Sequence, residues 1–76
     1  MYYIYILKCK DGYYVGCTVN IKNRIIKHKE GQIPSTSRRL PVKLDFYICF
    51  KDKIKAFNFE KYLKSGSGRS FIKRHF

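Results

Sequence analysis

The stretch Tyr3–Thr18, "YIYILKCKDGYYVGCT", decides the fold. β-branched and aromatic residues fill both of its halves, and this composition is typical of β-strands. Between the halves lies Asp11-Gly12, a dipeptide that favours a two-residue hairpin turn. We therefore predict an antiparallel hairpin with Asp11 and Gly12 as its turn. The stretch is also rich in tyrosine, a residue that either packs a core or presents a phenol for chemistry.

This turn fixes the pairing of the two predicted strands. Cys9 would lie opposite Tyr14, and Leu7 opposite Gly16. Because side chains alternate along a strand, Tyr5 and Tyr14 would then share one face of the sheet. Gly16 would leave room beside the two phenols, either because a ligand or another backbone approaches closely or because the strand bends there.

The composition predicts a compact basic domain with a polyanionic partner. The chain has 76 residues, which suits a single small domain over residues 1–76 and leaves little room for an enclosed small-molecule pocket. Lys and Arg total 17 against 5 Asp and Glu, giving a net charge of +12, while 45% of the residues are hydrophobic, enough for a folded core. Such an excess of positive charge favours nucleic acid as the partner over an anionic membrane surface.

The cysteines and the chain ends predict a cytoplasmic protein. The 3 cysteines are odd in number, lie far apart and match no zinc-ligand spacing, so we expect reduced thiols. We find no signal-like segment at the N-terminus and no apolar run long enough to span a bilayer, and we expect no membrane insertion.

The region after the hairpin predicts a helix of about three turns. Asn20 is a good N-cap, and Gly31 is typical of the position just past a helix end. Ile21, Ile25 and His28 recur on one stripe, as on the buried face of an amphipathic helix.

The second half of the chain predicts a loop, a third strand and two further helices. Residues 32–41 show no periodicity and form a long loop, which is itself a mild indication of function. Residues 42–50 alternate as a half-buried strand does, with the apolar positions all on one side. These positions are Val42, Leu44, Phe46, Ile48 and Phe50. Asp52 would cap the next helix, and residues 65–68, "SGSG", would break the chain before a last basic helix. We predict an α+β fold of order β-β-α-β-α-α, with a small three-stranded antiparallel sheet flanked by helices.

Three polar residues stand out as candidates for chemistry. Arg24 and His28 are four residues apart and lie on one helix face, which is either a solvated basic face or a phosphate-binding one. Glu60 lies beside an apolar stripe and is one of few acidic groups. It either pairs with a neighbouring lysine or holds a hard divalent ion together with phosphate oxygens and waters.

These residues, taken in order, resemble the GIY-YIG nuclease family. The resemblance rests on "YIY" at 3–5, "YVG" at 14–16, and the single residues Arg24, His28 and Glu60. The family's core is a β-β-α-β-α unit, so the resemblance covers essentially the whole chain. The segment "EKYLKSGSGR", residues 60–69, also looks like the end of small stand-alone bacterial members.

The resemblance implies a metal-dependent endonuclease that hydrolyses DNA with a tyrosine-activated water. Tyr5 would be the general base, and Tyr14 would order the water or share that role. Arg24 would bind the scissile phosphate, and His28 would position the nucleophile or the phosphate. Glu60 would hold a single Mg²⁺ or Mn²⁺ ion.

A phenol base has one physical requirement. Because a free phenol titrates near pH 10, Tyr5 acts as a base near neutrality only if nearby cations or the metal lower its pKa. We expect Arg24 and the surrounding lysines to provide that field.

Four basic residues are candidates for contacts with the DNA backbone: Lys27, Arg38, Arg39 and Arg69. Without an appended DNA-reading module, these contacts would follow the shape of the DNA, including branched or damaged DNA, more than its sequence. We expect no small-molecule substrate, and the residues leave open whether a partner protein or a second copy takes part. The alternative is a basic nucleic-acid-binding module of the same fold that does not cut.

Overall fold

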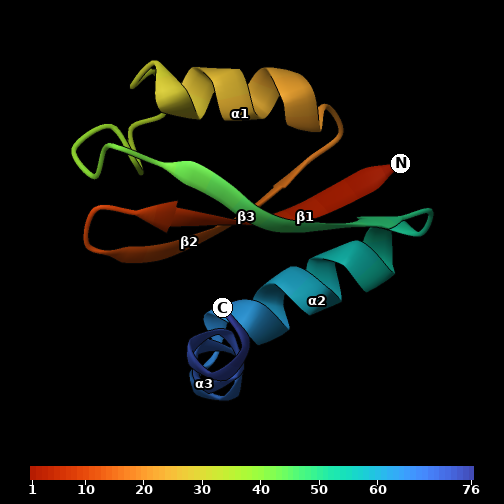
Figure 1. The fold of residues 1–76 in the computed structure, drawn as a ribbon. Helices are drawn as coiled ribbons and strands as arrows, with labels where there is room; N and C mark the ends of the chain where they lie inside the picture. The colour runs from red at the N-terminus through yellow and green to blue at the C-terminus, as the bar shows by residue number, and fades with distance from the viewer.

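The computed structural model describes residues 1–76. Its elements are, in chain order, β1 (Tyr2–Cys9), β2 (Gly12–Thr18), α1 (Ile21–Lys29), β3 (Lys43–Phe50), α2 (Lys53–Lys64) and α3 (Gly66–His75). The strands form one antiparallel sheet in the order β2-β1-β3. Figure 1 shows α1 on one side of the sheet and α2 and α3 on the other. The predicted fold class and element order are confirmed.

The predicted helix caps are also present. The side chain of Asn20 accepts a hydrogen bond from the Asn23 backbone N–H at 3.1 Å, and that of Asp52 accepts one from the Ile54 N–H at 2.8 Å. These bonds satisfy N–H groups that the first turn of a helix leaves without an internal partner. Past the end of α1, Gly31 has φ +75°, a conformation that costs a glycine little.

The predicted break at residues 65–68 is confined to Ser65. This residue ends α2 and caps α3, and its Oγ accepts from the Gly68 N–H at 3.2 Å. Gly68 lies within α3, where a Cβ atom would overlap the Tyr62 carbonyl and the Leu63 backbone. The glycine therefore lets α3 pack directly on α2, and the expectation of a four-residue break was wrong.

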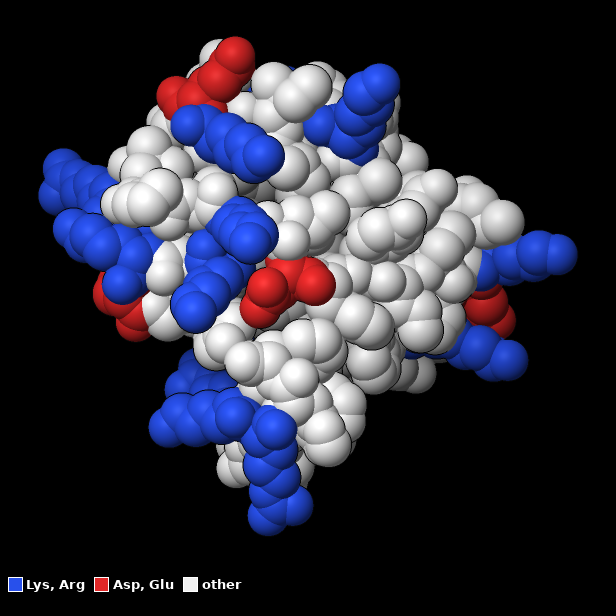
Figure 2. Space-filling model, viewed as in Figure 1, with Lys and Arg blue, Asp and Glu red and all other residues white.

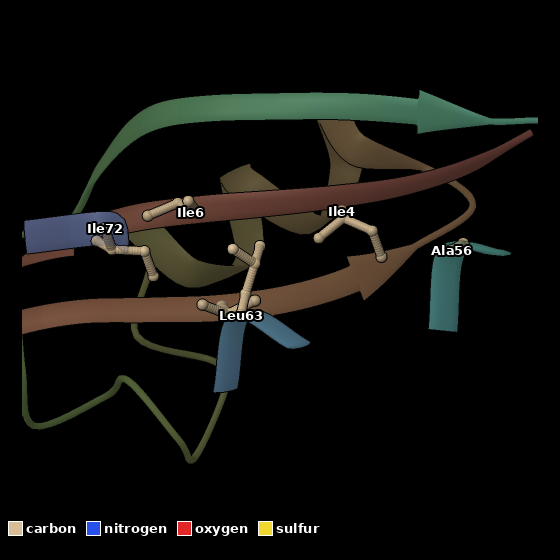
Figure 3. Close-up of a cluster of buried hydrophobic side chains, with 6 residues drawn as sticks. Ile4, Ile6, Ala56, Leu63 and Ile72 are labelled. Carbon is tan, nitrogen blue, oxygen red and sulfur yellow. The ribbon is translucent and has the colours of Figure 1, made fainter. Parts of the chain in front are cut away.

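Two buried apolar clusters lie on opposite faces of the sheet. The larger one fills the space between the sheet and the helices α2 and α3, and Figure 3 shows Ile4 and Ile6 facing Leu63. Its members are Ile4, Ile6, Val15, Ala56, Leu63 and Ile72. The smaller one lies beneath α1 and the loop that follows it. Its members are Tyr5, Leu7, Cys9, Ile25 and Val42.

The hairpin turn differs from the prediction by two residues in register. The pairs observed are Cys9 with Gly12, Leu7 with Tyr14, and Tyr5 with Gly16. A type I′ turn at Asp11-Gly12 needs positive φ at both residues, but only glycines have positive φ in this chain, so the turn falls on Lys10 and Asp11. Because a two-residue shift preserves the faces, Tyr5 and Tyr14 still lie on the same side of the sheet.

The third strand contains a bulge that the sequence pattern did not indicate. Ile6 pairs with Phe46, whereas the next residue, Leu7, pairs with Leu44, which leaves Asp45 without a counterpart in β1. Leu44 consequently packs on the cluster beneath α1, and Phe46 packs on the opposite cluster. The prediction that all the apolar residues of this strand share one face was wrong.

The charged side chains on the surface are mostly basic. Figure 2 shows Lys and Arg side chains around most of the outline, with isolated acidic groups between them. None of the helices combines the length and apolar character that a bilayer crossing requires.

Candidate functional site

Tyr5 lies in the middle of the sheet, on the side that α1 covers. Its side chain is 2% exposed, and its hydroxyl oxygen lies 2.8 Å from His28 Nε2. A Cβ atom on Gly16 would overlap the Cζ and hydroxyl oxygen of this phenol. Gly16 therefore does make room on this face, but the ring of Tyr5 fills that room.

Three aromatic rings meet at this point of the sheet. The Tyr14 ring centroid lies 6.3 Å from that of Tyr5 and 5.2 Å from that of His28. The centroids of Tyr5 and His28 are 5.6 Å apart. Tyr14 is only half-buried, so it is the phenol of this ring cluster that water reaches more readily.

Arg24 lies one helical turn before His28 and is half-buried. Burial raises the pKa of Tyr5 and lowers that of His28, and the positive charge of Arg24 opposes the first shift and adds to the second, so the guanidinium acts on the ring cluster. His28 itself is 0% exposed, so the alternative of a solvated basic face was wrong for this residue.

Burial decides the protonation of the two innermost groups. Loss of hydration, and next the neighbouring Tyr14, raise the pKa of Tyr5 well above its usual value, and the opposing effect of Arg24 is smaller. Arg24 does lower this pKa, as expected, but burial outweighs its effect, so the net lowering that a base requires is not present and the phenol of Tyr5 is neutral. Burial, and then Arg24, lower the pKa of His28, so its imidazole is neutral near pH 7.

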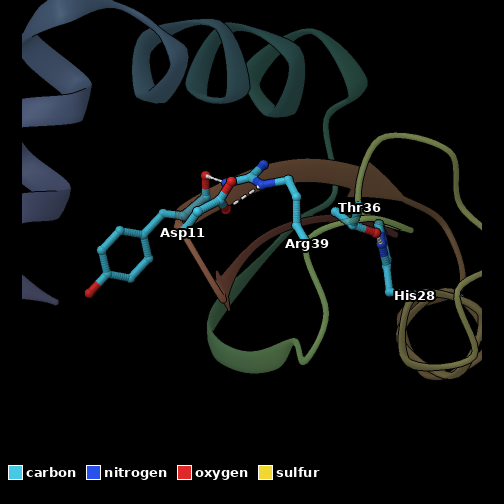
Figure 4. Close-up of polar contacts among 5 residues, drawn as sticks. Asp11, His28, Thr36 and Arg39 are labelled. Carbon is cyan, nitrogen blue, oxygen red and sulfur yellow. Dashed lines mark hydrogen bonds and ion pairs between the residues drawn. The ribbon is translucent and has the colours of Figure 1, made fainter.

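Thr36 is a site residue that the sequence analysis missed. It is 0% exposed, and its Oγ1 lies 2.7 Å from His28 Nδ1 (Figure 4). The available signal was a loop with three hydroxyl residues that is long for so small a protein. Nothing in that composition distinguishes Thr36 from Ser35 or Ser37.

Glu60 lies on α2, against the opposite face of the sheet. Its Oε2 is 3.1 Å from Lys64 Nζ, so the predicted ion pair with a neighbouring lysine is confirmed. Burial is the main cause that raises the pKa of Cys17, a residue of β2, and the charge of Glu60 adds to it. Glu60 is also the smallest of the causes that raise the pKa of Tyr5.

The donor atoms present suit one simple kind of metal site. No group of three or more His, Cys, Asp or Glu residues comes together in the structure. Magnesium, however, is commonly held by one or two carboxylates, with substrate phosphates and waters completing its coordination. Glu60, whose side chain is 22% exposed, fits that arrangement, but only with substrate present.

The four predicted DNA-contacting residues fall into two groups. Lys27, Arg38 and Arg69 are exposed. Arg39 is instead engaged within the protein: its Nε donates to Asp11 Oδ1 at 2.7 Å, and its Nη2 donates to the Tyr13 carbonyl at 3.2 Å (Figure 4). Arg39 thus fastens the loop after α1 to the hairpin turn.

An open groove of about 540 Å³ runs between β2 and the helices α2 and α3. Its basic side chains are Arg39, Lys64, Arg69 and Lys73, and the apolar residues Val15, Leu63 and Ile72 also line it. Tyr14 lines this basic groove too, and it is the residue that connects the groove to the ring cluster.

Comparisons with known proteins show which family and fold this chain resembles. A family model described as the GIY-YIG catalytic domain matches residues 1–74. A UPF0213 protein of Bacillus licheniformis is 41% identical over 71 residues, covering 91% of this chain and 73% of that protein. One from Staphylococcus saprophyticus is 42% identical over 74 residues, covering 95% of this chain and 90% of that protein. The solution NMR structure of a UPF0213 protein from Bacillus halodurans superposes with a TM-score of 0.60 at 34% identity, covering 97% of this chain and 84% of that one.

Proposed function

Because the chain belongs to the GIY-YIG family, we propose that it is an endonuclease that hydrolyses DNA phosphodiester bonds with the help of one divalent metal ion. The observation that supports this most is the ring cluster, in which Tyr5, Tyr14 and His28 meet under the charge of Arg24. The proposal gives roles to five residues that are separated in the sequence, and its support is that four of them lie on the same side of the sheet.

In this proposal the two tyrosines have different tasks. Tyr14 is half-buried and lies on β2, the strand that borders the basic groove, so its phenolate form is placed to take the proton of the attacking water. Tyr5 is buried and keeps its proton, which suits it to donate a hydrogen bond to a phosphate oxygen. His28 holds the phenol of Tyr5 in place.

Arg24 is proposed to bind the scissile phosphate. A guanidinium presents several N–H donors in a fixed plane and stays charged, so it stabilises the extra negative charge of a phosphoryl transition state. The adjoining phosphates would then follow the basic groove and the exposed basic residues. Such contacts make binding sensitive to salt and largely independent of sequence.

Glu60 is the residue that would hold Mg²⁺ or Mn²⁺, with Lys64 displaced from its carboxylate. A bound divalent ion supplies charge neutralisation for the leaving oxygen of the phosphodiester. Glu60 lies beside β2, the strand that carries Tyr14, and this position supports the assignment.

The test is a cleavage assay on duplex, nicked, branched and single-stranded DNA with Mg²⁺ or Mn²⁺. We expect Arg24→Ala and Glu60→Gln to lose cleavage, whereas Glu60→Gln retains DNA binding. The matched control is Glu30→Gln, which removes an exposed carboxylate whose contact is with Gln32, and this variant should cut normally.

Each other outcome has a definite meaning. A protein that binds these DNAs and cuts none of them is the non-catalytic binding module, and the proposal is then wrong. Cleavage by the Glu60→Gln variant would instead contradict the assignment of Glu60 as the metal ligand.

A further inference from the structure

The loop between α1 and β3 places one hydroxyl group inside the core. Thr36 is fully buried, and the partner of its Oγ1 is His28 Nδ1 at 2.7 Å. The adjacent hydroxyl, on Ser37, instead donates to the Pro34 carbonyl at 3.3 Å in a more exposed position. One particular hydroxyl of the loop is therefore built into the ring cluster.

The backbone around Thr36 holds this hydroxyl in position. The N–H of Thr36 donates to the Ile33 carbonyl at 3.1 Å, and its own carbonyl accepts from the Arg39 N–H at 2.9 Å. Arg39 in turn accepts from the Lys10 N–H at 2.9 Å and pairs with Asp11. Since Lys10 and Asp11 form the turn between β1 and β2, the loop is fastened to the hairpin that carries both tyrosines.

The neutral imidazole of His28 lies between two hydroxyl groups and has two ways to bond them. A neutral imidazole has one N–H donor and one acceptor nitrogen. If Tyr5 donates to Nε2, then Nδ1–H donates to Thr36. If Thr36 donates to Nδ1, then Nε2–H donates to the Tyr5 oxygen.

Each arrangement leaves one buried hydroxyl proton without an acceptor within the protein. In the first it is the proton of Thr36, which is 0% exposed, and in the second it is the proton of Tyr5, which is 2% exposed. Only the second leaves the Tyr5 proton available to a phosphate oxygen bound beside Tyr14, which is the role proposed for Tyr5 above.

We propose that Thr36 is a positioning residue whose hydroxyl donates to His28 Nδ1 and thereby fixes the Nε2–H tautomer and the orientation of Tyr5. The choice of this tautomer and its effect on cleavage both rest on the role proposed for Tyr5. The tautomer is nevertheless measured without substrate, so the two can fail separately.

The primary test is ¹⁵N NMR of the His28 ring in the unmodified protein near neutral pH. We expect Nε2 to be protonated and Nδ1 to be unprotonated. A protonated Nδ1 would overturn the proposal, whether or not the protein proves to be a nuclease.

Three variants extend this test. Thr36→Val keeps the shape of the side chain and removes the hydroxyl, so the single His28 tautomer should be lost and kcat should fall by about 10- to 100-fold, the range typical of residues that orient a functional group. KM should change little, because Thr36 does not touch the DNA. Thr36→Ser should restore both the tautomer and kcat, and Ser37→Ala, in the same loop, should alter neither.

The variants can also contradict the proposal. A folded Thr36→Val protein with the original tautomer and the original kcat would do so. So would a folded Thr36→Ser protein that recovers neither property.

Discussion

The phenol of Tyr5 and the imidazole of His28, 23 residues apart in the chain, meet in the interior with Tyr5 Oη 2.8 Å from Nε2. This bond joins β1 to α1 and satisfies two polar groups that would otherwise be buried without a partner. The same bond holds the Tyr5 ring against Gly16. The stability of the fold and the geometry of the ring cluster therefore depend on the same atoms.

We predict that Gly16→Ala destabilises the protein by about 1–3 kcal/mol, the usual cost of overpacking a core. The new methyl group would overlap the Tyr5 phenol, which His28 holds in place. Urea unfolding monitored by circular dichroism measures the effect. The matched control is Gly66→Ala, where a Cβ atom meets nothing within 4 Å at the start of α3. An unchanged unfolding free energy in Gly16→Ala would contradict the close contact.

Removing the hydroxyl of Tyr5 and removing that of Tyr14 should have different effects on the unfolding free energy and on cleavage. Tyr5→Phe leaves His28 Nε2 buried without its partner, so we expect a loss of about 1–3 kcal/mol. Tyr14→Phe removes a half-buried hydroxyl that has no hydrogen bond within the protein, and its unfolding free energy should hardly change. We nevertheless expect Tyr14→Phe to lose cleavage. Full activity in Tyr14→Phe would exclude Tyr14 as the base.

Protonation of His28 should make the protein less stable in mild acid. Burial and Arg24 lower the pKa of the folded state below the value of about 6.5 that an exposed histidine has. Between these two pKa values the unfolded chain binds a proton that the folded chain does not, so the unfolding free energy falls as the pH falls. The stabilising contribution is fully present above about pH 6.5 and is lost as the pH drops through the folded-state pKa.

Urea titrations between about pH 7.5 and pH 5 measure this dependence around the histidine pKa. His28→Gln should flatten it, since glutamine does not titrate, whereas His75→Gln changes an exposed residue at the end of α3 and should retain it. An unfolding free energy that stays constant over this range in the unmodified protein would show that His28 does not titrate as inferred.

The sequence predicted those features that depend on local patterns. Asn20 and Asp52 act through bonds within their own helix turns, and Tyr5 and Tyr14 share a face because any register shift by two preserves alternation. The bulge at Asp45 and the buried role of Thr36 depend on contacts between distant segments. No local pattern distinguishes such contacts, which is why both were missed.

The two adjacent arginines of the loop are a further case in which the sequence alone could not distinguish two residues. Measurements of DNA binding can test the difference between them. Sequence analysis gave Arg38 and Arg39 the same role. In the structure Arg38 is exposed, whereas Arg39 bonds to Asp11 and to the Tyr13 carbonyl.

We therefore predict different effects for the two arginines. Arg38→Ala should weaken DNA binding similarly for all sequences and reduce the slope of log K against log salt concentration by about 1, because it removes one phosphate contact. Arg39→Ala should leave that slope nearly unchanged and lower the melting temperature, because it removes the side-chain bonds that join the loop to Asp11 and to the Tyr13 carbonyl. It should also lower kcat, because the loop that carries Thr36 then keeps its backbone bond to Lys10 but loses the side-chain bonds to Asp11 and Tyr13. Fluorescence anisotropy over a salt series and thermal melts distinguish the two variants. A reduced slope with an unchanged melting temperature in Arg39→Ala would contradict this prediction and show that Arg39 contacts the DNA.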